Sequence, residues 1–350
     1  MHARITGYAK WVVLILAVLV GVLLIYVWLW RCTEARLPET TGPWGAGRNI
    51  LTVVDGARPD PFGSGPVRRL SVVLWYPTKP QKDVAAPYAP GRWTEALDRA
   101  NAVNTLVYRS VSRVYSRALT TPPSGGKHPL LLFEPGYGKT ALEYSALLEE
   151  LASRGFVIAA ITPTYSVRAT VIDGKIAEQM PRGTVDEDAA PDKLEAGLRH
   201  KLLPVWMADF DSVRTFLLGN AKFAAAIDFS KVALVGHSLG GAAAVEHCVH
   251  VQWCSAAVDI DGRTFLETET TAAPRLLIGV SKERAFLSHL QSIRYQRAAT
   301  APHEAVTDIA WLFNPMVARL TGHAIDRPAR TINTIATTAA DFLRSAWHDR

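Results

Sequence analysis

The chain has few charged residues, and no part of it is strongly charged. Lys, Arg, Asp and Glu make up 20% of its 350 residues, and the net charge is +6. Lys and Arg never occur in runs of more than two residues, which argues against the basic patches typical of nucleic-acid binding. The sequence has no internal repeat. Its hydrophobic fraction of 49% is that of a globular chain.

Cysteine is also scarce, with only Cys32, Cys248 and Cys254. Two alternatives remain open for the second and third: a disulfide if the compartment is oxidising, or two buried free thiols. His247 and His250 beside them have a spacing seen in zinc sites. Because these residues lie on one expected helix and its exit, no metal ion is predicted, and no other cofactor is expected.

The longest stretch without charge is Trp11–Trp30. At 1.5 Å per residue a helix of this length spans the bilayer core, about 30 Å. The sequence therefore predicts a transmembrane anchor after a short flank (1–10) and before a linker (31–47). A cleaved signal peptide is the rival interpretation, but the run is long and ends in aromatic residues, Tyr26–Trp30, instead of small ones.

The orientation of this anchor rests on a slight charge bias. Arg4 and Lys10 lie on one side of the apolar run, and Arg31 and Arg36 lie on the other. Since a large domain that follows a signal anchor is usually translocated, the domain is predicted to be extracytoplasmic.

Strands and helices alternate along 48–350. This order predicts an α/β-hydrolase fold, with a mostly parallel central sheet and helices on both faces. The expected strands are Ile50–Val54, Leu70–Tyr76, Leu130–Phe133, Phe156–Ile161, Val232–Val235, Ala256–Ile260, Arg275–Val280 and Ile293–Ala301. The expected helices are Trp93–Leu119, Leu142–Arg154, Val205–Leu218, the one after Ser238, and Arg330–Trp347.

Two segments leave alternatives open. The insert 164–204 contains a predicted hairpin, Val171–Ile176, closed by Asp-Gly. It is either part of a lid over the carboxyl edge of the sheet or a surface excursion. In the helix expected over 93–119, three arginines recur every four residues. They form either a solvated face over a packed helix or a basic face lying on anionic lipid. These arginines are Arg109, Arg113 and Arg117.

The segment Val232–Gly241, VALVGHSLGG, has the pattern of a nucleophile elbow. An apolar strand breaks into G-x-S-x-G and then into small residues. The sharp turn from strand to helix leaves little room for side chains, which Gly236 and Gly240 provide. Ser238 is therefore the predicted catalytic nucleophile.

A serine nucleophile needs a histidine base and an acid that holds the imidazole in one tautomer. In the α/β-hydrolase fold these residues occur along the chain in the order serine, acid, histidine. Asp259 and Asp261 both end the next expected strand, and Asp261 is favoured because a turn follows it at once. His303 and His323 lie on loops, whereas His289 is expected on a surface helix and His348 in the tail. Of the two loop histidines, His303 is favoured because it follows a plausible last strand and precedes a helix, which places it at the catalytic edge of the sheet.

The oxyanion of acyl transfer needs two backbone donors. One is the N–H of the residue after the nucleophile, Leu239. The other is expected from the loop after the strand ending at Phe133, where the glycines of Glu134–Gly138 allow close approach of a ligand. The N–H of Tyr137 is the predicted second donor.

Five motifs occur in the order and spacing of plasma-type platelet-activating factor acetylhydrolases and their bacterial relatives. They are FEPGYG, YSALLEELASRGFVIAAI, GHSLGG, AAVDIDG and HEAVTD. The resemblance covers 46–350 and includes RRLSVVLWYP and the ending IDRPARTINTIATTAADFL. It implies triad roles for Ser238, Asp261 and His303, and oxyanion-hole positions for Tyr137 and Leu239. The chain departs from the animal enzymes at Glu134-Pro135, where they carry Ser-His.

The sequence thus predicts a membrane-anchored serine hydrolase that cleaves carboxylic esters. The resemblance implies a lipid or phospholipid short-acyl ester as substrate, and no protein partner is evident. A broad carboxylesterase or polyester hydrolase, an acyltransferase and a non-catalytic, membrane-tethered binding module are the alternatives, since one fold hosts many chemistries.

Overall fold

The fold was analysed in a computed structural model. It describes residues 2–63, 65–100, 107–263, 265, 273–281 and 293–348, with side chains from residue 10 onward.

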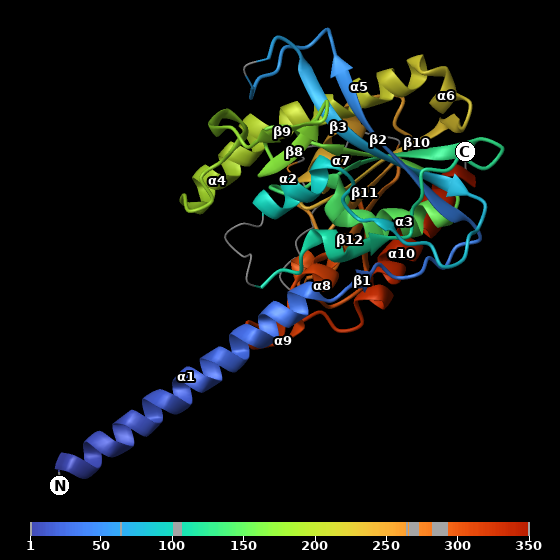
Figure 1. Ribbon diagram of the computed structural model, residues 1–350. Coiled ribbons are helices and arrows are strands. Elements are labelled where there is room, and N and C mark those ends of the chain that lie inside the picture. The colour runs from blue at the N-terminus through green and yellow to red at the C-terminus, as the bar shows by residue number, and fades with distance from the viewer. Residues whose placement is uncertain are drawn as a thin grey trace.

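An eight-stranded sheet forms the centre of the domain (Figure 1). Its order is β13-β12-β11-β10-β6-β7-β3-β2, parallel from β13 to β7, with β3 and β2 added antiparallel at one edge. The prediction of a mostly parallel α/β sheet is confirmed. The strands are β2 (Gly45–Asp55), β3 (Arg68–Thr78), β6 (His128–Glu134), β7 (Val157–Thr162), β10 (Ile227–His237), β11 (Ala256–Ile260), β12 (Arg275–Gly279) and β13 (Ile293–Arg297).

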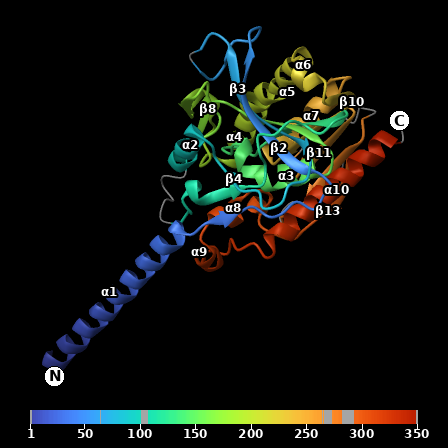
Figure 2. The same cartoon turned by 45° about the vertical axis from the view of Figure 1, so that its right-hand side comes forward.

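Helices cover both faces of this sheet, because its inner strands are apolar on both sides. One buried cluster joins α3 and α10 to the sheet, and the second joins α5 and α7 to the opposite face (Figure 2). The α-helices after the first are α2 (Arg92–Ala100), α3 (Ser145–Ser153), α4 (Pro191–Gly197), α5 (Leu203–Gly219), α6 (Ala221–Ala224), α7 (Leu239–His250), α8 (Ile309–Leu312), α9 (Pro315–Leu320) and α10 (Pro328–His348). Short helical turns are η2 (Val111–Arg113), η3 (Ala141–Tyr144), η4 (Pro181–Gly183), the π-helical η5 (Leu198–Leu202) and η6 (His303–Val306).

The segment expected as a linker lies against the domain. Strand β1 (Ala35–Arg36) pairs with β5 (Val114–Ser116), which also pairs with β4 (Ala86–Pro87). Leu37 is fully buried. The hairpin expected in the insert is present as β8 (Ala169–Ile172) and β9 (Lys175–Glu178), so that prediction is confirmed.

The helix expected over Trp93–Leu119 is present as α2 (Arg92–Ala100) but is wrong from Val107 onward. Residues 101–106 lie outside the described residues, and after them the chain forms the η2 turn and strand β5. The periodic arginines therefore do not share one helix face. Arg117, for example, follows β5 and donates to the carbonyl of Leu37. Since these arginines do not lie on one helix, neither a solvated helix face nor a basic helix face on anionic lipid is present.

The N-terminal helix α1 (His2–Cys32) projects from the domain, and most of its described side chains are exposed (Figure 1). Lys10–Cys32 is long and apolar enough to cross a membrane, a property that signal sequences share. At its end, Arg109 lies over the Trp30 ring, 4.7 Å from guanidinium carbon to ring centroid, and donates to the carbonyl of Thr33. Arg109 also donates to the carbonyl of Trp311, so it ties the helix end to the domain.

Candidate active site

Ser238 occupies the turn between β10 and α7. Its backbone has φ 56° and ψ −118°, a strained conformation for a residue with a side chain. A Cβ on Gly236 would lie 2.2 Å from the backbone of Gly240, and one on Gly240 would lie 2.2 Å from the carbonyl oxygen of Glu134. The two glycines thus allow the tight turn that holds Ser238 at the edge of the sheet.

Asp261 and His303 meet beside this turn. The Nδ1 atom of His303 lies 2.6 Å from Oδ2 of Asp261. The other oxygen, Oδ1, accepts hydrogen bonds of 2.9 Å from the N–H groups of Val280 and Ser281. Burial alone raises the pKa of Asp261, but these three hydrogen bonds outweigh burial and hold that pKa well below its usual range. Asp261 is therefore an anion that orients the imidazole.

The alternatives weighed for the acid and base lie elsewhere. Asp259 is buried beneath the turn, where a Cβ on Gly241 would lie 1.9 Å from its Oδ1. His323 is exposed and contacts Thr321. His348 ends α10, and His289 lies outside the described residues.

The loop after β6 borders the same site. The N–H of Gly136 donates to the hydroxyl of Tyr144 at 2.9 Å, so it is not free for a ligand. Tyr137 lines a cavity together with Ser238 and Leu239. Its hydroxyl accepts a hydrogen bond of 3.1 Å from the N–H of Val185, which attaches the loop to the insert.

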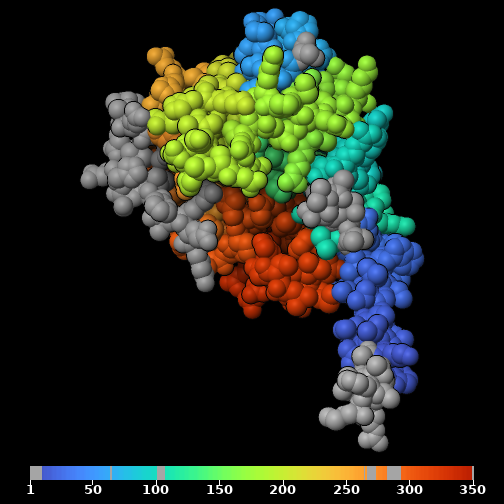
Figure 3. Space-filling view, turned by 90° about the vertical axis from the view of Figure 1, so that its left-hand side faces the viewer, coloured from blue at the N-terminus to red at the C-terminus, as the bar shows by residue number. Residues whose placement is uncertain are grey.

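The cavity at Ser238 has a volume of about 380 Å³. One wall comes from the insert, and Arg263, which also lines the cavity, pairs with Glu195 of α4 at 3.3 Å. In Figure 3 the yellow-green insert and the orange-red C-terminal segment face each other across a recess. The residues that line the cavity are Tyr137, Glu187, Pro191, Leu194, Glu195, Leu198, Ser238, Leu239, Ala242, Arg263 and Phe265.

An ion-pair bridge, which no sequence motif predicts, joins the loop after β6 to the η6 turn that carries His303. Lys139 lies 3.6 Å from Glu143 and 3.5 Å from Glu304, the residue after His303. Burial lowers the pKa of Lys139, but the two carboxylates outweigh it and raise that pKa above its usual value. No sequence spacing marks this contact, because Lys139 and Glu304 come from distant loops.

Glu134, where the sequence departs from the animal enzymes, ends strand β6 and is fully buried. Neither of its carboxylate oxygens has a hydrogen-bond partner among the described residues. Burial and the nearby charge of Asp209 raise its pKa well above the usual value. Burial thus favours the neutral, protonated form of Glu134.

Replacing Glu134 with Gln is expected to stabilise the protein increasingly as pH rises. The pKa of Glu134 is higher in the folded state than in the unfolded state. Below the unfolded-state pKa both states are protonated, so Glu134 does not change the free energy of unfolding. Above that pKa the unfolded state ionises more readily, and the free energy of unfolding falls by up to about 1.4 kcal/mol per pH unit. Thermal unfolding of the wild type and E134Q between pH 5 and 9 measures this gap. The exposed Glu39→Gln is the control, and equal gaps at all pH values would contradict the assignment.

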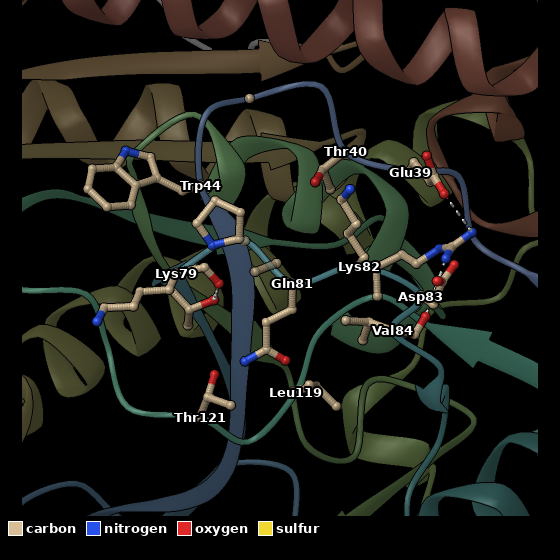
Figure 4. Close-up of a pocket in the computed structure, with 16 residues that line it drawn as sticks. Glu39, Thr40, Trp44, Lys79, Gln81, Lys82, Asp83, Val84, Leu119 and Thr121 are labelled. Atoms are coloured by element: carbon tan, nitrogen blue, oxygen red, sulfur yellow. Dashed lines mark hydrogen bonds and ion pairs between the residues drawn. The ribbon is translucent and has the colours of Figure 1, made fainter.

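A second cavity of about 360 Å³ lies apart from this site (Figure 4). Segment 39–46 and the loop 78–84 line it, with Arg117 between Glu39 and the carbonyl of Val84. It contains neither Ser238 nor His303. Among the described residues, no group of three His, Cys, Asp or Glu side chains could hold a metal ion. Cys248 and Cys254, weighed as metal ligands, form a disulfide at the end of α7.

The sheet order and the elbow at its centre define an α/β-hydrolase. The model of the family "Platelet-activating factor acetylhydrolase, isoform II" matches residues 36–179. The chain is thus an α/β-hydrolase related to that family, and the resemblance drawn from the sequence motifs is confirmed.

The chain is also similar in sequence to individual proteins with platelet-activating factor acetylhydrolase names. A probable 1-alkyl-2-acetylglycerophosphocholine esterase of Arthroderma benhamiae is 27% identical over 242 residues, which cover 65% of this chain and 58% of the relative. The platelet-activating factor acetylhydrolase of Gallus gallus is 28% identical over 247 residues, covering 60% and 56%. The matches thus span little more than half the length of these relatives.

A solved structure matches over more of its length. A ferulic acid esterase from Streptomyces cinnamoneus superposes with a TM-score of 0.71 and 25% identity, covering 89% of this chain and 93% of that one.

Proposed function

We propose that this chain hydrolyses carboxylic esters through an acyl-enzyme on Ser238. The observation that carries the proposal is the hydrogen bond between His303 and Asp261 beside a serine in the strained elbow conformation. A serine hydroxyl is a weak nucleophile, so it needs a base whose tautomer is fixed. Asp261 supplies this by accepting the Nδ1 proton, which leaves Nε2 of His303 free to accept another.

The reaction follows from this arrangement. The Ser238 oxygen attacks the ester carbonyl while its proton passes to His303, and the N–H groups of Tyr137 and Leu239 stabilise the oxyanion. The proton then passes to the departing alcohol, and the acyl group stays on Ser238. Water attacks the acyl-enzyme by the same route, which releases the acid and restores the serine hydroxyl.

The proposed substrate is a phospholipid with a short acyl group. Two observations support it. The relatives from Arthroderma benhamiae and Gallus gallus are named as an acetylglycerophosphocholine esterase and a platelet-activating factor acetylhydrolase. The apolar helix α1 would also hold the domain at a bilayer surface. A second candidate is an aryl ester such as a ferulate. The solved ferulic acid esterase matches nearly its full length, and the cavity carries apolar walls from Leu194, Leu198 and Phe265.

We also propose that α1 is an uncleaved anchor with the domain on the extracytoplasmic side. The Cys248–Cys254 disulfide supports this side, because disulfides persist in oxidising compartments. The contacts of Arg109 with Trp30 and Thr33 support an anchor that stays attached to the folded domain.

A fluorophosphonate probe tests the proposed chemistry directly. The full chain in detergent is expected to take up one probe molecule at Ser238, located by mass spectrometry, and to turn over p-nitrophenyl esters. The Ser238→Ala variant is expected to do neither. A folded wild type without label or turnover would refute the proposal, and comparing phospholipid with ferulate esters then separates the two substrate candidates.

A further inference from the structure

Two buried polar side chains beside Ser238 have no part in the reaction described above. Tyr144 is fully buried in η3, and His237, the residue before the nucleophile, is 1% exposed. Burying a polar side chain costs free energy unless its hydrogen bonds are made. Their mutual arrangement therefore needs an explanation.

The hydroxyl of Tyr144 connects Gly136, in the loop after β6, to His237. It accepts the N–H of Gly136 at 2.9 Å and lies 2.8 Å from Nδ1 of His237. Burial raises the pKa of Tyr144 well above its usual value, so the hydroxyl keeps its single proton. Among the described residues, Nδ1 of His237 is the acceptor within reach of that proton. His237 therefore accepts at Nδ1, carries its proton on Nε2 and is neutral.

His237 in turn packs on the proposed catalytic base. The ring centroids of His237 and His303 are 4.4 Å apart, with the planes tilted by 33°. One edge of the His303 ring is held by Asp261, and one face is held by His237. When His303 accepts the serine proton it becomes a cation. The face of a neutral aromatic ring attracts that cation, whereas a protonated His237 would repel it.

We infer that Tyr144 and His237 are positioning residues for the base: Tyr144 keeps His237 in the neutral Nε2–H form, and His237 supports the His303 ring in both protonation states. The same hydroxyl fixes Gly136, so it also sets the loop that presents Tyr137. This inference rests on the proposed function, because it concerns the base of that reaction.

Several charged groups of the described residues lie near the stack. Asp261 faces His303, and Glu304 next to His303 is paired with Lys139. The carboxylates of Glu304, Glu143 and Asp308 act on Tyr144, with Glu304 the strongest of the three. With the hydroxyl removed, Nδ1 of His237 loses the proton donated by Tyr144, and the inference expects the ring to bind a proton more readily.

The Tyr144→Phe variant tests the inference, because it keeps the ring that packs on Phe133. We expect kcat to fall about tenfold with KM nearly unchanged, since the hydroxyl holds the base and not the substrate. The acid limb of the pH profile is expected to steepen, because a protonated His237 adds a second inactivating ionisation. The control is Tyr88→Phe, which removes another fully buried hydroxyl, bonded to Asp308 at 3.0 Å. Y88F is expected to keep the wild-type slope.

A result in which Y144F and Y88F behave alike, or in which Y144F keeps the wild-type kcat and profile, would overturn the inference. A readout independent of turnover is the ¹⁵N spectrum of the full chain labelled at histidine. His237 is expected in the neutral Nε2–H form in the wild type from pH 5 to 8 and to protonate within this range in Y144F. If the wild type shows this tautomer but no turnover, the proposed function fails and the positioning contact stands. If His237 is cationic in the wild type, the inference fails whatever the activity.

Discussion

Replacing Asp261 with Asn is expected to lower kcat by about 10⁴-fold while leaving the fold intact. The change keeps the shape of the side chain but removes the anion that accepts the Nδ1 proton of His303. The amide can donate to Nδ1, which favours the tautomer with its proton on Nε2, and that atom can then no longer accept the serine proton. Initial rates on a soluble short-chain ester measure the loss, and thermal unfolding checks the fold.

Asp259→Asn is the matched control for this experiment. Asp259 and Asp261 are two residues apart and both are buried: Asp259 lies near the end of β11, and Asp261 directly follows that strand. The carboxylate of Asp259 lies beneath the elbow against Gly241 and not at His303. We expect D259N to reduce kcat by less than about tenfold, with its main effect on stability. Equal losses in both variants would contradict the role proposed for Asp261.

Much of the fold could be predicted because its signals are local. Apolar runs such as Leu130–Phe133 are buried on both faces, and the turn at Ser238 requires small neighbours, so strands and the elbow follow from short stretches of sequence. The prediction over 93–119 was wrong at its end, because the spacing of its apolar residues fits a helix. In the structure Val114–Ser116 instead forms a strand that pairs with β1 and β4. Such pairing depends on strands that are distant in sequence, and the local propensity of a segment does not contain that information.

In the candidate site, too, the residues marked by local motifs could be predicted, whereas the contacts between distant segments could not. The sequence predicted Ser238, Asp261 and His303 from the order of the motifs and the family resemblance, and the structure brings Asp261 and His303 into contact. The contacts that surround them join residues far apart in sequence, such as Tyr144 with His237 and Lys139 with Glu304. Neither pair has a spacing signature, because each depends on how two loops pack at the sheet edge.

The full-length chain is expected to remain in the membrane fraction after alkaline carbonate washing and to keep its N-terminal residues. Each Leu, Ile, Phe or Val at the centre of a spanning helix favours insertion by about 0.3–0.6 kcal/mol, whereas an Arg there costs about 2.5–3.5 kcal/mol. Leu19→Arg combined with Leu23→Arg is therefore expected to release the chain from the membrane. Val12→Leu combined with Val13→Leu is the matched control and is expected to stay bound.

The disulfide then reports the side of the membrane. Without reductant, a maleimide is expected to label the exposed Cys32 and to leave Cys248 and Cys254 unlabelled, because an oxidising compartment keeps that pair bonded. Labelling of all three in unreduced, unfolded protein would place the domain on the reducing side. A soluble product that begins beyond Trp30 would instead identify the helix as a cleaved signal. In that case the enzyme would reach a lipid ester by diffusion, and the contact between Arg109 and Trp30 would be absent from the mature protein.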